Sequence, residues 1–210
     1  MSAPPKTVLY VNAAEAEAIR NAVRGADVTL LSPAHRVADA GDVDALVALL
    51  SDAEVSGPIY DLPRPVTRDT VNSWVEQARL RQSQGEEILC IMADDNGELS
   101  GYSYFTIWPE RSAAEIAGAH RADTQGRGHG KAGAARSFGW MFEHLGVRLI
   151  GLTAAKDNIR SAKVIEAAGF RPMGERTNVQ PDGGLRQSLY WEMTRDEWRA
   201  FSGSNALSRS

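Results

Sequence analysis

The chain has 210 residues, of which 43% are hydrophobic and 24% charged, and it carries a net charge of −4 and one cysteine. This length and composition suit a single globular domain with a full core, and the acidic balance argues against a protein that binds nucleic acid. No apolar run approaches the roughly 20 residues that span a bilayer, and the N-terminus lacks the features of a signal peptide, so a cytoplasmic protein that does not enter a membrane is expected.

The first part of the chain predicts strands and helices in alternation. Gly25 is expected to end the first helix, because glycine commonly follows a helix C-terminus. Apolar residues at helical spacing predict the second helix, and Thr67 is the expected N-cap of the third. The expected elements are strands over 7–12 and 28–31, helices over 13–24, 42–50 and 67–82, and a proline-rich loop over 56–65.

The middle of the chain changes to the two-residue period of β-strands. Two apolar runs flank Asp95-Asn96-Gly97, and an Asn-Gly pair between such runs is the strongest short signal of a hairpin. Helix and strand patterns alternate from there, and a turn over 181–184 separates the last two strands. The expected elements are strands over 87–94, 101–108, 112–120, 147–154 and 186–194, a strand that begins at Phe170, and helices over 130–145 and 159–168.

The cysteine and the histidines predict neither a disulfide nor a metal site. Cys90 lies in the apolar run 87–93 and is expected to be a buried, inert thiol. A single cysteine excludes an internal disulfide and a cysteine-rich zinc site. The four histidines, at positions 35, 120, 129 and 144, lack the close spacing of metal ligands, so no metal is expected.

A glycine-rich segment lies where the strand over 112–120 gives way to a helix. Residues 124–131 are Thr-Gln-Gly-Arg-Gly-His-Gly-Lys. Glycines let consecutive backbone N–H groups turn toward one anion, and the start of the next helix adds unpaired N–H groups and the positive end of its dipole. The segment therefore predicts a phosphate-binding loop.

Two common phosphate-loop motifs do not fit this segment. A Walker A loop needs a glycine where Gln125 stands and a hydroxyl residue where Ala132 stands. The dinucleotide fingerprint G-x-G-x-x-G occurs from Gly128 to Gly133, but no buried strand leads directly into it. Such a domain also needs an acidic residue near the end of the next strand, and position 153 is threonine.

Three motifs, in order along the chain, resemble the GNAT superfamily of acetyl-CoA-dependent N-acyltransferases. Residues 125–130 fit the family's pyrophosphate pattern Q/R-x-x-G-x-G/A. Residues 158–170 resemble the pattern N-x-x-S-x-x-V-x-E-x-x-G-F of its ribosomal-protein-alanine acetyltransferase branch, and Glu115 stands where that branch often has a strand glutamate. The resemblance extends over about residues 28–195.

The resemblance implies an α/β (α+β) fold, in which helices flank a central mixed, mostly antiparallel sheet of six to seven strands. It divides the chain into a βα extension over 1–27, the GNAT domain over 28–201 and a flexible tail over 202–210. Relatives often associate through their C-terminal strands, so a homodimer is one expected assembly.

The resemblance also implies that acetyl-CoA is the cosubstrate. The backbone amides of the glycine loop would bind its pyrophosphate, the end of the strand over 112–120 would bind the pantetheine arm, and the Asn158 side chain would hold that arm from the other side. The residues expected to bind acetyl-CoA are Gly118, His120, Gln125, Gly126, Arg127, Gly128, His129, Gly130, Lys131 and Asn158.

Glu115 is the candidate general base by its motif position, since a partly desolvated carboxylate can accept a proton near neutral pH. An outward-facing glutamate paired with a surface cation is the alternative, because the neighbouring strand residues are apolar on both faces. Many GNAT enzymes carry a proton-donating tyrosine where Ile165 stands here. Ser161 is therefore the candidate general acid, with a helix-start hydroxyl as its alternative role. Further candidate donors are Tyr102, Tyr104 and Tyr190.

The expected function is direct transfer of an acetyl group from acetyl-CoA to a primary amine of a small molecule or of a protein or peptide N-terminus, in a ternary complex. The alternative is a GNAT-fold protein that binds acyl-CoA as a sensor or interaction module without transfer, which the missing tyrosine favours. Tyr60, Trp74 and Trp108 fall in regions that border the acceptor site in related folds, but they do not identify the acceptor.

Overall fold

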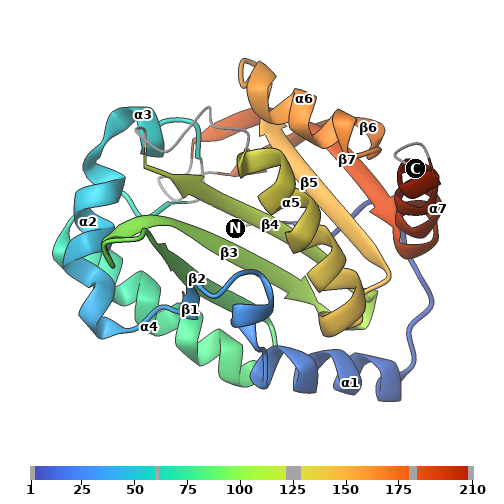
Figure 1. Cartoon of the computed structure of the whole chain (residues 1–210), viewed down its shortest axis with the longest axis horizontal. Helices are drawn as coiled ribbons and strands as arrows, with labels where there is room; N and C mark the ends of the chain where they lie inside the picture. Colours follow the sequence, from blue (N-terminus) through green and yellow to red (C-terminus); the bar gives the residue numbers. More distant parts are fainter. Residues whose placement is uncertain (1–2, 60–61, 122–128, 180–183, 208–210) are drawn as a thin grey trace.

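The computed structural model of the chain describes residues 3–59, 62–121, 129–179 and 184–207. These residues form one open sheet in the strand order β1-β2-β3-β4-β5-β7-β6, and every neighbouring pair is antiparallel except β4 and β5 (Figure 1). The predicted fold, with a mixed and mostly antiparallel sheet, is confirmed. The strands are β1 His35–Val37, β2 Glu87–Ala93, β3 Leu99–Trp108, β4 Ala113–His120, β5 Leu149–Ala155, β6 Arg171–Val179 and β7 Leu185–Thr194.

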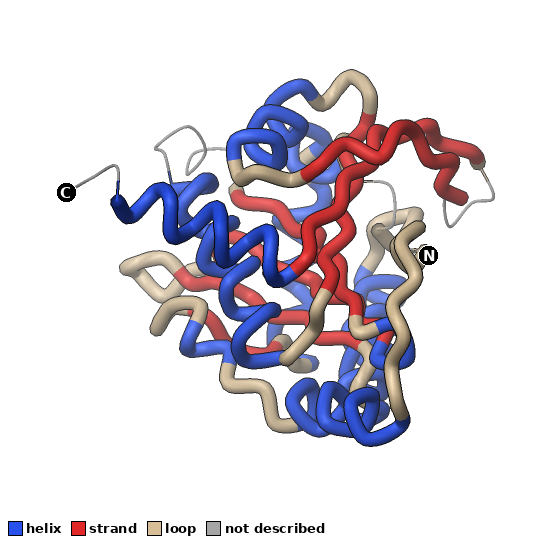
Figure 2. Tube along the Cα trace, turned by 90° about the vertical axis from the view of Figure 1, so that its right-hand side faces the viewer, coloured by secondary structure: helices blue, strands red, loops and turns tan. Residues whose placement is uncertain are grey.

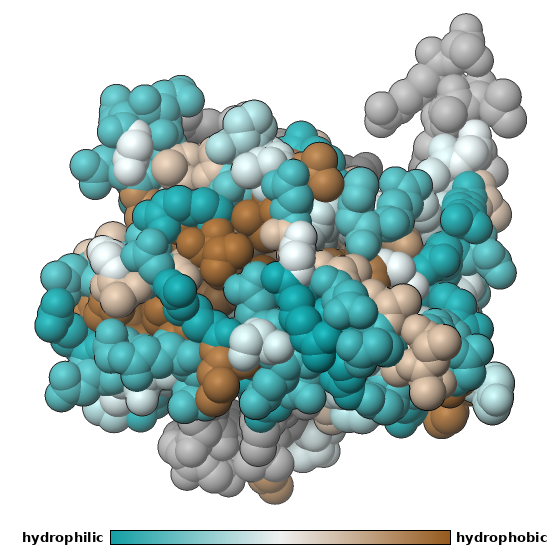
Figure 3. Space-filling model, turned by 90° about the horizontal axis from the view of Figure 1, so that it is seen from below, coloured by the Kyte–Doolittle hydropathy of each residue, from teal (hydrophilic) through white to brown (hydrophobic). Residues whose placement is uncertain are grey.

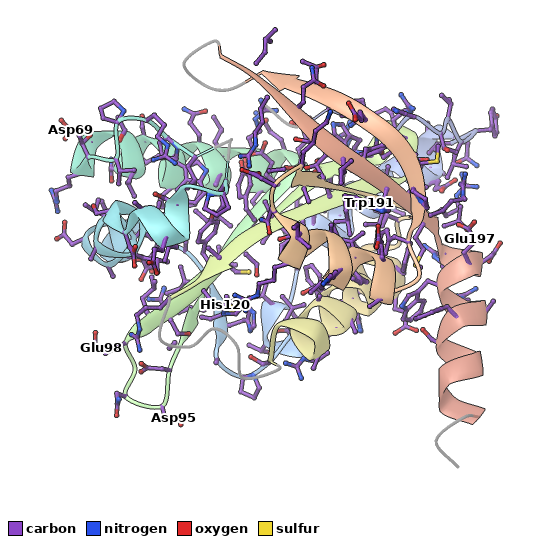
Figure 4. The ribbon with its side chains drawn as sticks, turned by 90° about the horizontal axis from the view of Figure 1, so that it is seen from above. Asp69, Asp95, Glu98, His120, Trp191 and Glu197 are labelled. Atoms are coloured by element: carbon purple, nitrogen blue, oxygen red, sulfur yellow. The ribbon has the colours of Figure 1, made fainter. Side chains whose placement is uncertain are left out.

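Helices cover both faces of the sheet, with α5 and α6 on one face and α2 and α4 on the other (Figure 4). Successive strand residues point to opposite faces. In β3, Phe105 therefore packs on Trp140 of α5, with ring centres 5.1 Å apart, whereas Tyr104 packs on Trp74 of α4 at 5.6 Å. The helices are α1 Ala13–Arg24, α2 Val43–Ser51, α3 Ala53–Ser56, α4 Arg68–Gln84, α5 His129–Trp140, α6 Ile159–Ala167 and α7 Arg195–Leu207, and a π-helical turn over Met141–Leu145 continues α5.

Local capping and turn signals set several of these boundaries as predicted. The Asn12 side chain accepts a 2.9 Å hydrogen bond from the Glu15 amide at the start of α1, and Gly25 follows its end. Thr67 caps α4 as expected. Gly97 has φ +80° in the turn between β2 and β3, which confirms the predicted hairpin.

Both early strand predictions are wrong. Residues 7–12 run as a coil, in which the side chains of Arg111 and Arg148 bond the carbonyl oxygens of Thr7 and Tyr10 in place of a partner strand. Residues Val28–Leu30 form a 3-10 turn, because the Asp27 carboxylate accepts a hydrogen bond from the Thr29 amide at 3.0 Å and favours a turn over a strand. The first strand, β1, begins at His35.

Helix α7 extends to Leu207, into the segment 202–210 that the sequence predicts to be a flexible tail, and residues 208–210 lie outside the described part. Thr194 and Glu197 explain the helix, since each side chain bonds the backbone amide of the other at 3.2 and 2.8 Å. The predicted turn over 181–184 falls mostly outside the described residues. Within the described part, every helix is too short or too polar to cross a bilayer.

Candidate active site

Strands β4 and β5 pair for two residues and then part. Ala113 pairs with Leu149 and Ala114 with Ile150, and no later pair joins these two strands, which the structure describes throughout. Each strand keeps its outer neighbour, since β4 stays paired with β3, and β5 with β7. Figure 1 shows the two strands diverging, and we call the region beyond Ala114 and Ile150 the split. A ligand in the split can reach the backbone N–H and C=O groups of both strands.

The connecting helix α5 begins at His129, toward the open end of the split (Figure 1). The first N–H groups of a helix lack partners within it, and the dipole is positive there, so this end favours an anion. Of the predicted loop positions, Gln125, Gly126, Arg127 and Gly128 lie outside what the structure describes. His129, Gly130 and Lys131 are described only as part of helix α5, without the side chains of His129 and Lys131.

Glu115 is the first β4 residue beyond the last pair with β5, and its side chain is buried at 7% exposure. The Thr153 hydroxyl of β5 donates a 2.8 Å hydrogen bond to Glu115 Oε1 across the split. A buried carboxylate bonded in this way rules out the alternative of an outward-facing surface glutamate. Thr153 could not be predicted from the sequence, because only the position of two distant strands in the sheet brings it to Glu115.

A second buried carboxylate lies on the same face of the sheet. Tyr190 of β7 pairs with Thr153, and its hydroxyl donates a 2.7 Å hydrogen bond to Glu192 Oε1. Burial first, and then this bond to the Glu192 carboxylate, raise the pKa of Tyr190. Burial alone would raise the pKa of Glu192, but hydrogen bonds from Thr7, Tyr190 and the Lys6 amide hold it below its ordinary value.

Glu192 is a further residue of the site that the sequence motifs do not predict. The sequence does carry a signal, since Tyr190 and Glu192 alternate with the apolar residues Trp191 and Met193. In a strand, this pattern places the two polar side chains on one face and the two buried apolar side chains on the other. Figure 4 shows Trp191 on β7, across the sheet from His120 at the end of β4.

Asn158 and Ser161 lie together at the start of α6, at the end of β5. The side-chain oxygen of Asn158 caps the helix by accepting a 3.0 Å hydrogen bond from the Ser161 amide. The capping group is therefore Asn158, and the Ser161 hydroxyl is not the helix cap that sequence analysis weighed against a catalytic role. Both residues are half-buried.

Gly118 and His120 follow Glu115 along β4 and are exposed. A Cβ atom on Gly118 would lie 2.5 Å from the backbone oxygen of Tyr102 in β3, so glycine is needed for the close approach of the two strands. His120 pairs with Gly101, at the other end of β4 from the paired Ala113 and Ala114.

A cavity of about 470 Å³ lies at the end of β5, close to the start of α6. It extends the site, because Ala155 in its wall lies two residues beyond Thr153 and so on the same face of β5. Its walls carry both acidic and basic groups. The lining residues are Gly57, Ala155, Lys156, Asp157, Leu185, Arg186 and Gln187.

A second hollow, of about 360 Å³, lies at the edge strand β1 and far from the split along the sheet. Val37 and Ala38 supply its apolar residues, and Arg24, Arg79 and Gln82 are among its polar ones. Figure 3 looks onto this side of the molecule and shows hydrophobic residues inside a hydrophilic rim.

Two of the remaining candidate proton donors, Tyr102 and Tyr104, lie on β3 on the same face of the sheet as Glu115. The Tyr104 hydroxyl bonds Glu87, and Tyr102 packs edge-on against Trp74 at 5.4 Å. Tyr60 lies outside the described residues, and Trp108 pairs with Ala113 at the closed end of the split. Cys90 is buried and burial raises its pKa to about 12, which fits the predicted inert thiol. Among the described residues, no three metal-binding side chains gather at one place.

Comparisons with known proteins agree with this geometry. The sequence profile of the acetyltransferase (GNAT) domain matches residues 34–171. No curated protein matches the chain. Ribosomal-protein-S5-alanine acetyltransferase from Vibrio fischeri is 17% identical with a TM-score of 0.66, covering 78% of this chain and 93% of its own.

Two further solved structures are similar. RimJ from Mycobacterium smegmatis, in complex with CoA-disulfide, is 18% identical with a TM-score of 0.66 and covers 78% of this chain and 82% of its own. Spermidine N-acetyltransferase from Vibrio cholerae, in complex with CoA and spermine, is 17% identical with a TM-score of 0.67, and the match covers 78% of this chain and 96% of that protein's chain. At these identities the structures show a shared fold, and the profile match shows the family: the chain belongs to the GNAT acetyltransferases and is an N-acetyltransferase of that family.

Proposed function

We propose that the protein transfers an acetyl group from acetyl-CoA directly to a primary amine, within a ternary complex. The observation that carries this proposal is the buried Glu115 carboxylate at the apex of the β4–β5 split, with the start of α5 toward the open end. A thioester in the split would lie beside a proton acceptor, and its phosphates would meet the start of a helix.

In this proposal acetyl-CoA lies along the split. The pantetheine arm bonds the backbone of β4 from Gly118 to His120, and the amide group of Asn158 donates to it from the opposite side. The glycine loop and the first turn of α5 bind the pyrophosphate, through backbone N–H groups over residues 125–131. Acetyl-CoA is a substrate here, and the proposal needs no metal.

Glu115 is the proposed general base. It takes a proton from the acceptor ammonium, directly or through one water, and the neutral amine attacks the thioester carbon to form a tetrahedral intermediate. The bond from Thr153 fixes the orientation of the carboxylate. Collapse of the intermediate breaks the C–S bond and releases CoA as a thiolate, while the attacking nitrogen loses its second proton to water and the amide forms.

Ser161 is the proposed general acid that returns a proton to this thiolate. The third position of α6 puts the residue next to Asn158, which supports a place near the pantetheine end. Tyr190 is a weaker candidate, because its proton is already donated to Glu192.

The acceptor is a small-molecule amine or the N-terminus of a peptide or protein. The similar structures include a ribosomal-protein-S5-alanine acetyltransferase and a spermidine N-acetyltransferase, so both acceptor classes belong in the first test. Purified protein, acetyl-CoA and a panel of polyamines and alanine-terminated peptides should release free CoA and yield acetylated amine by mass spectrometry. Binding of acetyl-CoA without CoA release across a broad panel would contradict transfer and favour a non-catalytic acyl-CoA-binding module.

A further inference from the structure

The N-terminal coil is tied to the sheet by the buried Glu192 carboxylate. Glu192 has 0% exposure and accepts hydrogen bonds from the Lys6 amide at 2.6 Å, from the Thr7 amide at 3.1 Å and from the Thr7 hydroxyl. The same carboxylate accepts the Tyr190 hydroxyl at 2.7 Å. A buried carboxylate is stable only when it is bonded in this way, so the coil completes the surroundings of Glu192.

Two arginine side chains also hold this coil. Arg111 donates to the carbonyl oxygens of Pro5 at 2.9 Å and of Thr7 at 3.2 Å. Arg176 donates to the carbonyl oxygens of Ala3 at 2.7 Å and of Pro4 at 2.9 Å. Figure 2 shows the coil running from beside the β6–β7 hairpin down the side of the molecule to α1.

The coil reaches the apex of the split. Gly151 is the first β5 residue beyond the last pair with β4. A Cβ atom on Gly151 would lie 2.5 Å from the Tyr190 hydroxyl and 3.2 Å from Cγ of Pro5. Gly151 and Thr153 share a face of β5, so Pro5 and Tyr190 stand on the face where Thr153 bonds Glu115.

A continuous set of contacts thus links the coil to the proposed base. Thr7 bonds Glu192, Glu192 bonds Tyr190, Tyr190 pairs with Thr153, and Thr153 bonds Glu115. Burial and Glu192 raise the pKa of Tyr190 most, and the Glu115 charge adds to the shift, as expected for groups at close range.

Glu115 shares its face of the sheet with Tyr104, which packs on α4, so this face lies opposite to α5 and to the proposed phosphate site. We propose that the acceptor amine approaches from this face, that the coil Ala3–Thr7 forms a wall there, and that Thr7 and Glu192 are positioning residues that hold Tyr190 beside the Glu115–Thr153 pair. The inference rests on the proposed function, because an acceptor side exists only if an amine is acetylated. It gives a role to a segment that lies outside the profile match to residues 34–171.

Three threonine variants test the inference. Thr7→Val removes the hydroxyl that bonds Glu192 and keeps the side-chain shape, whereas Thr7→Ser keeps the hydroxyl. Thr29→Val is the matched control, because Thr29 also bonds a carboxylate, that of Asp27 at 2.5 Å, but on an exposed turn at the other end of the sheet.

The expected kinetic result is a split between the two substrates. Thr7→Val should raise KM for the acceptor amine about fivefold and leave KM for acetyl-CoA within about twofold. Thr7→Ser and Thr29→Val should stay near wild type in both constants. If Thr7→Val lowers the melting temperature but leaves both KM values unchanged, the coil is only a structural tether and the inference is wrong.

A second measurement needs no turnover and separates this inference from the proposed function. Amide hydrogen exchange over residues 150–155 should quicken in Thr7→Val and stay slow in Thr7→Ser, since the coil stabilises β5 at the split. If the two Thr7 variants show this difference in exchange but the wild-type protein acetylates no amine, the proposed function is overturned and the acceptor wall with it. Active wild-type protein with equal exchange and equal acceptor KM in both Thr7 variants overturns the inference alone.

Discussion

The Thr153 hydroxyl donates a 2.8 Å hydrogen bond to Glu115 and so joins β4 and β5 just where their backbone pairing ends. A hydrogen bond between side chains thus links the two strands beyond their last backbone pair. This bond keeps the carboxylate buried and oriented in the split, while the strands remain apart to admit a ligand.

Removal of this bond should affect turnover more than acetyl-CoA binding. Thr153→Val should lower kcat about tenfold, because one hydrogen bond to the proposed base is lost, and should leave the Kd of acetyl-CoA within about twofold. Thr177→Val is the control, since Thr177 is exposed on β6 and bonds Gln187 instead. Equal losses of kcat in both variants would contradict a specific role for Thr153.

The cap of α6 separates a stabilising role of Asn158 from a binding role. Asn158→Asp keeps the oxygen that caps the helix but loses the amide donor, so stability should hold while acetyl-CoA binds more weakly. Asn158→Ala should also lower the free energy of unfolding by about 1 kcal/mol. Isothermal titration and urea unfolding of the two variants measure these effects. Unchanged acetyl-CoA affinity in both would show that Asn158 is only a helix cap.

Glu192 should make stability depend on pH. Its folded pKa lies below its unfolded pKa, so its contribution is present above the unfolded value of about 4.3 and is lost as the pH falls through the folded value. Glu192→Gln should therefore destabilise the protein most near neutral pH, with a difference from wild type that shrinks in acid. Urea unfolding at several pH values measures this difference in the free energy of unfolding, with Glu54→Gln, at an exposed position, as the control. A difference that stays constant with pH would contradict this assignment.

The close approach of β3 and β4 should make Gly118 sensitive to any side chain. Gly118→Ala should cost about 1–3 kcal/mol of unfolding free energy, because its Cβ atom would meet a backbone oxygen at 2.5 Å. Gly133→Ala on α5 is the matched control, since its Cβ atom would meet nothing within 4 Å and alanine favours a helix. Equal stability of the two variants would contradict the argument from strand spacing.

The elements that could be predicted from the sequence carry local signals. Asn12 and Thr67 cap helices, and Asn96-Gly97 turns a hairpin, within a few residues of the structure they specify. The strand predicted over 7–12 failed because its pattern cannot say whether a partner strand lies beside it. The helix α7 could have been predicted, since Thr194 and Glu197 have the spacing of a capping box.

In the candidate site, too, residues in local motifs could be predicted and residues brought together by long-range contacts could not. Motif position assigned Glu115 and Asn158 to the elements on which they lie, because those motifs are contiguous in sequence. Their neighbours could not be predicted, since Glu115 and Thr153 are 38 residues apart and Thr7 and Glu192 are 185 apart. Strand register and the path of the N-terminal coil set those contacts, and no local pattern records either.

The most direct test of the account compares Glu115→Gln with wild type and with Glu98→Gln, an exposed glutamate in the β2–β3 turn (Figure 4). Steady-state kinetics should show that Glu115→Gln lowers kcat by about 100-fold or more, as for a lost general base, while acetyl-CoA still binds within about twofold of wild type. Glu98→Gln should change neither value. Turnover of Glu115→Gln within about twofold of wild type would contradict the claim that Glu115 is the base.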